Sequence, residues 1–208
     1  PYIKEKMDLD IQVQKLKLLK SNFLSEKYAL EDKIIKYYPQ RITALENRIE
    51  GLKQDVDTAK QHPKPTDDRF VGMEVKGVFY SEKADAGKAI INACKQMNSP
   101  DPIPLGKYRG FETELLFNTA ERNYEVRLKG ATSRNVPLGD DAHGNIIRLD
   151  NGIDRFAESL SLAENDLENT KNQLETAKKE VQKPFIQEEE LKTKLARLDE
   201  LNILLNMD

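Results

Sequence analysis

The chain has 208 residues, of which 38% are hydrophobic and 33% are charged, and its formal net charge is −3. A composition so rich in charge does not supply a large globular core, and it favours one small domain with long solvated helices. The single cysteine excludes an intramolecular disulfide and is typical of a reducing compartment. Because the chain has no signal peptide and no apolar run of about 18 residues, we expect a cytoplasmic protein without membrane contact. The chain begins at Pro1 rather than at a methionine, so we also expect a piece of a longer polypeptide.

Residues 1–62 are predicted to form an N-terminal helical arm. Apolar residues crowd the segment 7–24 on more than one side, so this helix needs partners on two sides. Ser21-Asn22 or Ser25 marks a predicted break, followed by one helix kinked at Pro39, or two collinear helices, from about 25 to 61. In that helix the apolar residues recur in three-four alternation, which is typical of a coiled-coil seam: Ile35, Tyr38, Ile42, Leu45, Ile49, Leu52, Val56 and Ala59.

Between residues 66 and 150 the helical period disappears, and the sequence predicts a small α+β head domain. A short hairpin turns at Lys76-Gly77, and a helix over 83–97 carries Cys94 on its apolar face. The strands that follow have one apolar and one charged side, as in an antiparallel sheet covered by that helix. They are predicted at 107–117, 122–129, 132–138 and 146–149.

Residues 151–208 are predicted to form a C-terminal helical arm and a base helix. Asp150 or Asn151 caps the arm, and after Pro184 the base helix runs from about 187 to 206. Residues 1–65 carry a net charge of +3 and residues 151–208 one of −5, so the two arms attract each other. The arm has a second seam with the same alternation, broken only by Thr170: Ile153, Phe156, Leu160, Ala163, Leu167, Leu174, Ala177 and Val181.

These patterns predict an α+β fold in which a small antiparallel β-sheet plus one helix is inserted at the tip of an antiparallel coiled-coil helical hairpin. If Ala59 lies level with Ile153, then Tyr28 lies level with Pro184, and both arms break at the same height. The seams fit a hairpin closed within one chain and a swapped dimer equally well, and the sequence leaves both open.

The sequence offers no set of residues for catalysis or for a metal. Two histidines and one cysteine do not assemble a zinc site, and residues 140–145 lack the alternating ligands of a calcium-binding loop. Cys94 is expected to be a small buried apolar residue rather than a nucleophile. We therefore predict no catalytic residue, no metal and no cofactor in this fragment.

The best candidate binding surface is the charged side of the predicted strands. Basic side chains with a stacking aromatic among them can follow a nucleic-acid backbone. The alternative is an ordinary solvated face, because Glu112, Glu114 and Glu125 share that side. The candidate nucleic-acid-binding residues are Lys107, Tyr108, Arg109, Arg127, Lys129 and Arg134.

Several short segments carry a family resemblance: Gly77-Val78-Phe79-Tyr80, Tyr108-Arg109-Gly110-Phe111, Leu128-Lys129-Gly130, Gly144-Asn145-Ile146 and Lys183-Pro184-Phe185. With them the chain resembles the C-terminal region of very large bacterial mobile-element proteins that join a DNA methylase-like part to a Swi/Snf-type helicase. The resemblance implies a parent polypeptide with ATP-dependent helicase or DNA methylase activity, which would use ATP and S-adenosylmethionine. The motifs for those activities do not occur in this chain.

Two functions follow as hypotheses. The resemblance implies a non-catalytic accessory module that docks DNA, a partner protein or the rest of the parent polypeptide. The alternative is a structural coiled-coil module for oligomerisation or protein–protein interaction, including a homodimer through its helices.

Overall fold

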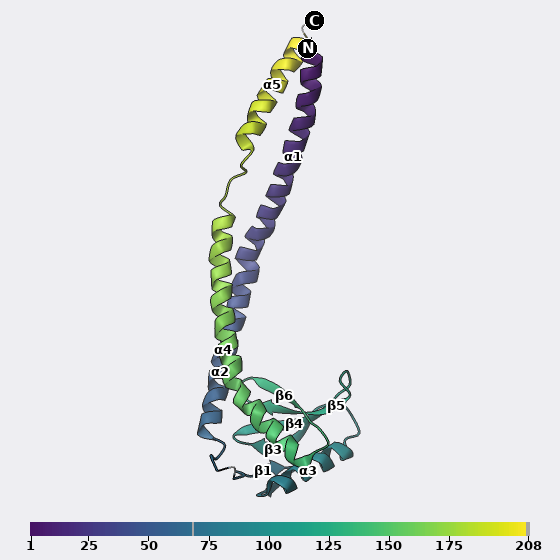
Figure 1. The fold of residues 1–208 in the computed structure, drawn as a ribbon, viewed down its shortest axis with the longest axis vertical. Coiled ribbons are helices and arrows are strands. Elements are labelled where there is room, and N and C mark those ends of the chain that lie inside the picture. Colours follow the sequence, from purple (N-terminus) through teal and green to yellow (C-terminus); the bar gives the residue numbers. More distant parts are fainter. Residues whose placement is uncertain (68, 207–208) are drawn as a thin grey trace. The chain divides into compact units, whose positions relative to one another are not determined.

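The computed structural model describes residues 1–67 and 69–206; Asp68, Met207 and Asp208, which fall in the predicted head domain and C-terminal arm, lie outside them. The chain is α+β, with helices and one six-stranded antiparallel sheet in the described residues (Figure 1). It divides into two compact units, residues 43–167 and residues 1–42 with 168–208. This division differs from the predicted domains 1–62, 66–150 and 151–208, because the ends of both predicted arms belong to the unit that holds the sheet.

The sheet of the 43–167 unit is antiparallel throughout, in the order β2-β1-β3-β4-β5-β6. Its short edge strand β2 pairs with β1, and its central strands β3, β4 and β5 form a meander. The strands are β1 (Met73–Val75), β2 (Val78–Tyr80), β3 (Ile103–Tyr108), β4 (Phe111–Asn118), β5 (Asn123–Lys129) and β6 (Ser133–Pro137).

Two-residue turns close two of the hairpins. Lys76-Gly77 joins β1 to β2 with φ of 53° and 80°, which confirms the predicted turn. Arg109-Gly110 joins β3 to β4 with φ of 46° and 81°. Positive φ at both turn residues matches the twist of paired strands. The prediction of one strand over 107–117 was therefore wrong, since the chain reverses within it.

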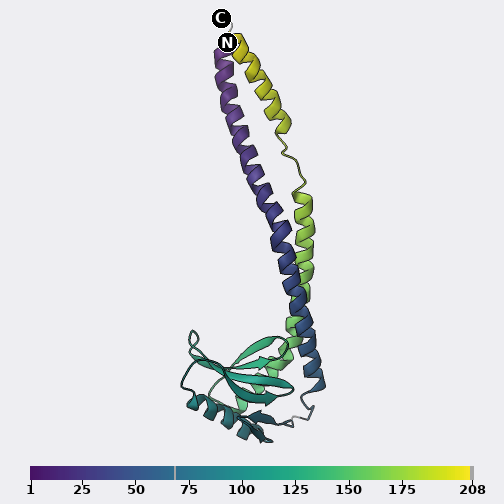
Figure 2. The same cartoon turned by 180° about the vertical axis from the view of Figure 1, so that it is seen from behind.

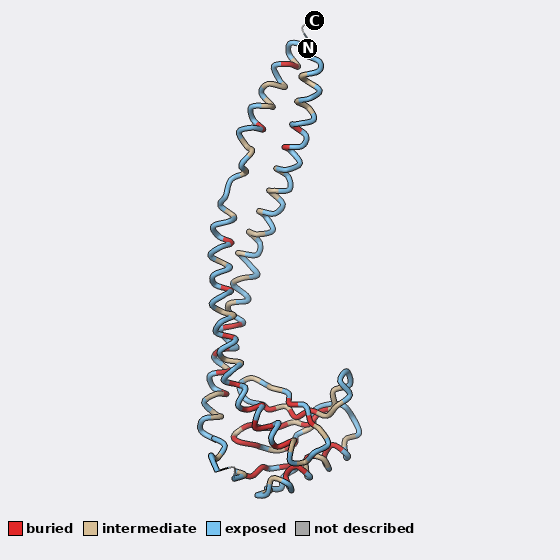
Figure 3. The backbone as a smooth tube through the Cα atoms, viewed as in Figure 1, coloured by how far each residue is buried: buried red, intermediate tan, exposed pale blue. Residues whose placement is uncertain are grey.

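The apolar side of the sheet is covered by α3 (Lys83–Gln96) and by the first part of α4 (Ala142–Glu180). Both ribbon views show α4 crossing the sheet (Figures 1 and 2). Buried residues concentrate where strands and helices meet (Figure 3). The rings of Phe111 in β4 and Phe156 in α4 stack with centroids 5.1 Å apart. The predicted helix over 83–97 is thereby confirmed, but α4 adds a second cover that was not predicted.

Helix α4 begins earlier than expected. The predicted strand at 146–149 and the predicted cap at Asp150 or Asn151 were both wrong, because these residues lie within α4. Asp141 caps the helix instead, accepting the backbone N–H of Gly144 at 2.8 Å. Ile146 and Leu149 extend the apolar stripe of the helix backwards by one turn, and both are fully buried in the core.

Most of α2 (Tyr38–Gln61), from Thr43 onward, also belongs to this unit. Leu52 is buried in the core, and Asp55 beside it is the only acidic side chain of α2 in the described residues that is buried. Its carboxylate accepts the backbone N–H groups of Ala131 at 2.7 Å and of Thr132 at 2.8 Å, and also the Thr132 hydroxyl. Asp55 thus fixes α2 to the turn between β5 and β6.

In the other unit, α1 (Tyr2–Asp32) packs antiparallel to α5 (Glu188–Asn206). Val13 and Leu16 bury against Leu191, and ion pairs join Glu5 to Arg197 at 2.8 Å and Lys20 to Glu188 at 2.9 Å. The base helix predicted at 187–206 is confirmed.

Helix α1 is continuous, so the predicted break at Ser21-Asn22 or Ser25 was wrong. The rings of Phe23 and Phe185 lie 5.6 Å apart, which places Phe23, not Tyr28, beside the segment that follows α4. Only the C-terminal side is interrupted at this level, so the two arms do not break at the same height.

A π-helical segment, η1 (Lys33–Tyr37), lies between α1 and α2 just before Pro39. Its wider turn accommodates a proline that has no N–H to donate, and it changes the phase of the apolar stripe. Ile34 is half-buried, whereas Ile35 is 72% exposed. The predicted seam position at Ile35 was therefore wrong.

We predict that Asp55→Asn lowers the free energy of unfolding by about 2 kcal/mol. The carboxylate accepts two backbone N–H groups, and the asparagine amide can accept only one of them, because its NH2 group replaces the other accepting oxygen. Urea unfolding monitored by circular dichroism measures the change. Asp57→Asn, at an exposed carboxylate of the same helix, is the matched control and should change stability little. Equal losses in the two variants would contradict the role of Asp55.

Candidate functional site

Three of the six candidate residues lie on the exposed side of the sheet. Strand register places Lys107 opposite Glu112, and Glu112 opposite Lys129, while Glu114 lies opposite Arg127. Glu114 accepts hydrogen bonds from Lys129 Nζ at 2.8 Å and from Arg127 Nη1 at 3.4 Å. The positive charges on this face are therefore largely neutralised by neighbouring carboxylates, as expected for a solvated surface.

The other three candidates do not lie on that face, so their predicted placement was wrong. Tyr108 lies opposite Phe111 on the apolar side and is 2% exposed, so its ring is not available for stacking on bases. Arg134 lies opposite Leu128 on the apolar side, with its guanidinium 5.5 Å from the centroid of the Phe156 ring. Arg109 lies in the turn that the sequence analysis missed.

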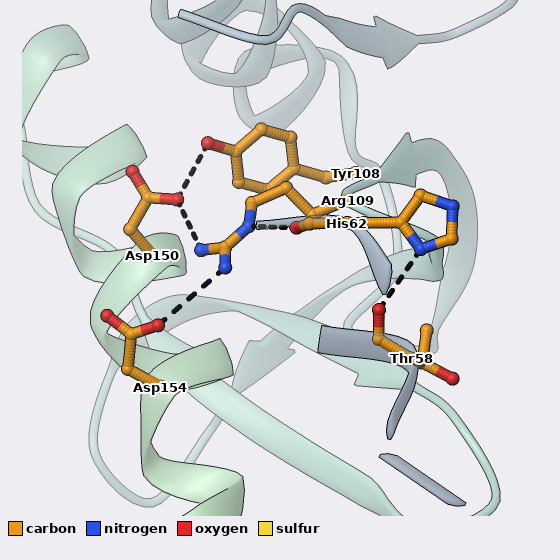
Figure 4. Close-up of polar contacts among 6 residues, drawn as sticks. All are labelled: Thr58, His62, Tyr108, Arg109, Asp150 and Asp154. Carbon is orange, nitrogen blue, oxygen red and sulfur yellow. Dashed lines mark hydrogen bonds and ion pairs between the residues drawn. The ribbon is translucent and has the colours of Figure 1, made fainter. Parts of the chain in front are cut away.

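Arg109 is the centre of a buried polar cluster (Figure 4). Its Nη1 donates to Asp150 Oδ1 at 3.0 Å, and its Nε donates to the backbone carbonyl of His62 at 3.0 Å. The Tyr108 hydroxyl donates to the same Asp150 oxygen at 2.8 Å. The side chains of Arg109 and Asp150 are only 4% and 5% exposed. At the solvent edge, Asp154 approaches Arg109 Nη2 at 3.7 Å.

Opposite charges neutralise each other within this cluster. Burial and the negative charge of Asp150 raise the pKa of Tyr108 above its ordinary value, so the phenol stays protonated and keeps donating its hydrogen bond. Asp150 balances the charge of Arg109, and the Nη1 and Nε groups of Arg109 each donate to an acceptor within the chain. We interpret the cluster as a structural junction of the β3–β4 turn, α4 and the end of α2, rather than as a reactive centre.

A hollow of about 430 Å³ lies beside this junction, within the same unit. Its walls are mainly apolar, with Val71, Met73 and the exposed ring of Phe79, and Lys107 and His62 stand at its edge. The His62 ring donates from Nδ1 to the Thr58 carbonyl at 3.0 Å (Figure 4). This arrangement is an apolar hollow with Glu74, Lys107 and His62 among its lining residues.

Cys94 is buried on the inner face of α3, as predicted. Burial raises the pKa of its thiol to about 11, so the thiol is protonated at neutral pH and is a weak nucleophile. Among residues 1–67 and 69–206, no three His, Cys, Asp or Glu side chains gather where they could hold a metal ion. No helix in that part of the chain has the length and apolarity needed to cross a membrane.

In comparisons with known proteins, no family model, no curated protein and no solved structure matches the chain.

Sequence reasoning missed Asp150 as the partner of Arg109, because it read Asp150 as a helix cap. The available signal was an acidic residue one position after Leu149 and three before Ile153, inside an apolar stripe. A buried acid at such a place needs a buried cation.

We predict that Arg109→Ala lowers the free energy of unfolding by about 3–5 kcal/mol, because it leaves the buried Asp150 carboxylate without its partner. Arg127→Ala removes a partly exposed ion pair at the surface of the same sheet and should cost less than about 1 kcal/mol. Chemical denaturation of both variants measures the difference. A similar small loss for both would contradict the junction.

Proposed function

We propose that this chain is a non-catalytic docking module of a larger DNA-processing protein, and that its docking surface lies on α1. The observation that carries the proposal is a row of large apolar side chains exposed along one side of α1. Ile3, Met7, Ile11 and Leu18 are each 57–67% exposed. Their spacing of four, four and seven residues keeps them on one face of the helix. We call these four residues the α1 stripe.

The α1 stripe lies roughly opposite the face that α5 covers. At about 100° per residue, Val13 and Leu16, which bury against α5, point away from the stripe. The helix is thus apolar on two sides, and α5 accounts for one. Apolar residues concentrated along one exposed face are typical of an interaction site rather than of a free surface.

The charges beside the α1 stripe favour a second copy of the chain, paired antiparallel, as the occupant. Asp8 and Asp10 flank the stripe in its first half, on opposite sides, and Lys15 and Lys17 flank it in the second half. In an antiparallel pair centred between residues 12 and 13, Asp8 would face Lys15 of the second copy, and Asp10 would face Lys17. Apolar layers would then join Met7 to Leu18 of the second copy.

The family resemblance supports the remaining part of the proposal, that the module serves a larger protein with helicase or methylase activity and itself binds neither ATP nor S-adenosylmethionine. The rest of that polypeptide is the alternative occupant of the α1 stripe. A purely structural coiled-coil module is the alternative function, and it would use the same surface.

We predict that the chain forms a dimer, so that its average mass in sedimentation equilibrium rises with protein concentration. Ile11→Lys should make it a monomer, because a charge would be buried in the seam. Leu162→Lys, at a comparably exposed apolar position of α4, is the matched control and should leave the dimer intact. A wild-type chain that is monomeric at every concentration would contradict self-association through α1.

Charge reversal tests the orientation. Asp10→Lys and Lys17→Asp should each weaken the dimer through repulsion, and the double variant should restore it, because each reversed residue again faces an opposite charge. Failure of the double variant to recover, with both single variants weakened, would contradict the antiparallel arrangement.

The coiled-coil helical hairpin with the sheet at its tip is also part of this proposal. It is supported by the shared apolar cluster of α2 and α4 residues within the 43–167 unit, among them Leu52 and Phe156. Spin labels at Lys33→Cys and Lys179→Cys, with Cys94 replaced by alanine, should report the short separation of adjacent helices. Dilution with unlabelled chain leaves that separation unchanged in a closed hairpin, whereas its loss on dilution would indicate a swapped dimer.

A further inference from the structure

A second hollow, of about 240 Å³, lies between β6 and α4 in the 43–167 unit. Three arginines line it, Arg134 from β6 and Arg148 and Arg155 from α4, together with the amides of Asn135 and Asn151. We call this surface the arginine groove. Gly152 lets the helix lie close to the strand here, because a Cβ at that position would stand 2.6 Å from Val136 Cγ2. The groove is therefore a built feature of the helix–sheet packing.

In the described residues the three arginines of the groove form no ion pair with a carboxylate, unlike several other arginines of this chain. Arg109, Arg127 and Arg197 are each ion-paired with a carboxylate. In the part of the chain that the structure describes, Arg148 and Arg155 form no ion pair, and Arg148 Nη1 donates only to the Pro137 carbonyl at 3.4 Å. Their positive charge is consequently available to a ligand.

Arg134 is held in place at the floor of the groove. Its guanidinium lies over Phe156 and donates to the backbone carbonyl of Arg155 at 3.3 Å and to the Ser159 hydroxyl. Its Nε is buried and has no hydrogen-bond partner among the described residues. Burial, followed by the nearby positive charges of Arg155 and Arg48, lowers the pKa of Arg134, although Glu158 opposes the effect. The positive charges gathered here repel one another, and a bound anion would reduce that repulsion.

We propose that the arginine groove binds the phosphate backbone of duplex DNA. This goes beyond the docking function proposed for α1, because it concerns a different surface and a different ligand. Arg148 and Arg155 are seven residues apart, so they project from one side of α4 about 10 Å apart along its axis. Guanidinium groups spread over that length on an exposed surface suit a repeated phosphate chain better than one small anion.

The composition of the groove also favours the duplex over single-stranded nucleic acid. Recognition of single strands relies on exposed aromatic rings on which bases stack, whereas the ring of Phe156 is buried beneath Arg134. Arginine and asparagine side chains that reach phosphates confer affinity without sequence preference. Residues 43–167 carry 17 Lys and Arg against 21 Asp and Glu, so the attraction for DNA would come from the groove and not from the net charge of the unit. Three arginines predict a slope of about 3 for the fall of log binding constant with log salt concentration.

The test is fluorescence anisotropy of the full chain with a labelled DNA duplex, titrated at several salt concentrations. Arg148→Gln with Arg155→Gln should weaken binding by about tenfold or more and lower the salt slope by about 2, because two phosphate contacts are lost. Both side chains are exposed, so the variant keeps its fold, which circular dichroism verifies. Lys88→Gln with Lys95→Gln removes two exposed charges from α3 and is the matched control, expected to bind nearly as the wild type does.

Three outcomes would overturn the proposal. If the arginine variant and the control variant bind alike, DNA does not use the groove. If the wild-type chain shows no salt-dependent binding of duplex, the ligand is wrong. If polyglutamate of equal length competes as well as unlabelled duplex, the groove recognises acidic peptides instead. None of these results affects dimerisation through α1, which sedimentation measures separately.

Discussion

The contact between Arg109 and Asp150 is the constraint on which the 43–167 unit depends. A buried guanidinium in a tight turn needs a buried carboxylate, and α4, which lies across the sheet, supplies one at that point. Asp150 therefore positions α4, and the His62 carbonyl, bound to Arg109 Nε, positions the end of α2. Asp55 holds the same helix at the neighbouring β5–β6 turn through Ala131 and Thr132. Together these contacts explain why the sheet unit includes parts of two long helices.

This fixed position of α4 has consequences for its outer surface. Leu149 and Ile153 point into the core, so Arg148 and Arg155 lie on the exposed side of α4, where they border β6. The same helix thus supplies a buried acid to the junction and two exposed cations to the groove. In the unit formed by residues 1–42 and 168–208, a similar division applies to α1, since one face packs on α5 and the opposite face is exposed.

The sequence predicted the elements whose periodicity is long or whose turns are distinctive. The α3 and α5 helices, the hairpin at Lys76-Gly77 and the apolar sides of β4 and β5 follow directly from spacing. The turn at Arg109-Gly110 was missed because arginine is an unusual residue at a position of positive φ. The phase change at Lys33–Tyr37 was missed because a π-helical turn has no compositional marker. Of the candidate site, only the side-chain types were accessible: whether an arginine is paired in the core or free at the surface depends on contacts distant in sequence.

Native-state hydrogen exchange of the full chain tests this account most directly, because it reports which amides open together. If Arg109 and Asp55 join the helices to the sheet, amides of residues 43–61 and 142–167 should exchange with the same free energy as those of β4 and β5. The amides of α1 and α5 should then exchange as a separate, less stable group. Exchange of residues 43–61 together with α1, independently of the sheet, would contradict the central claim.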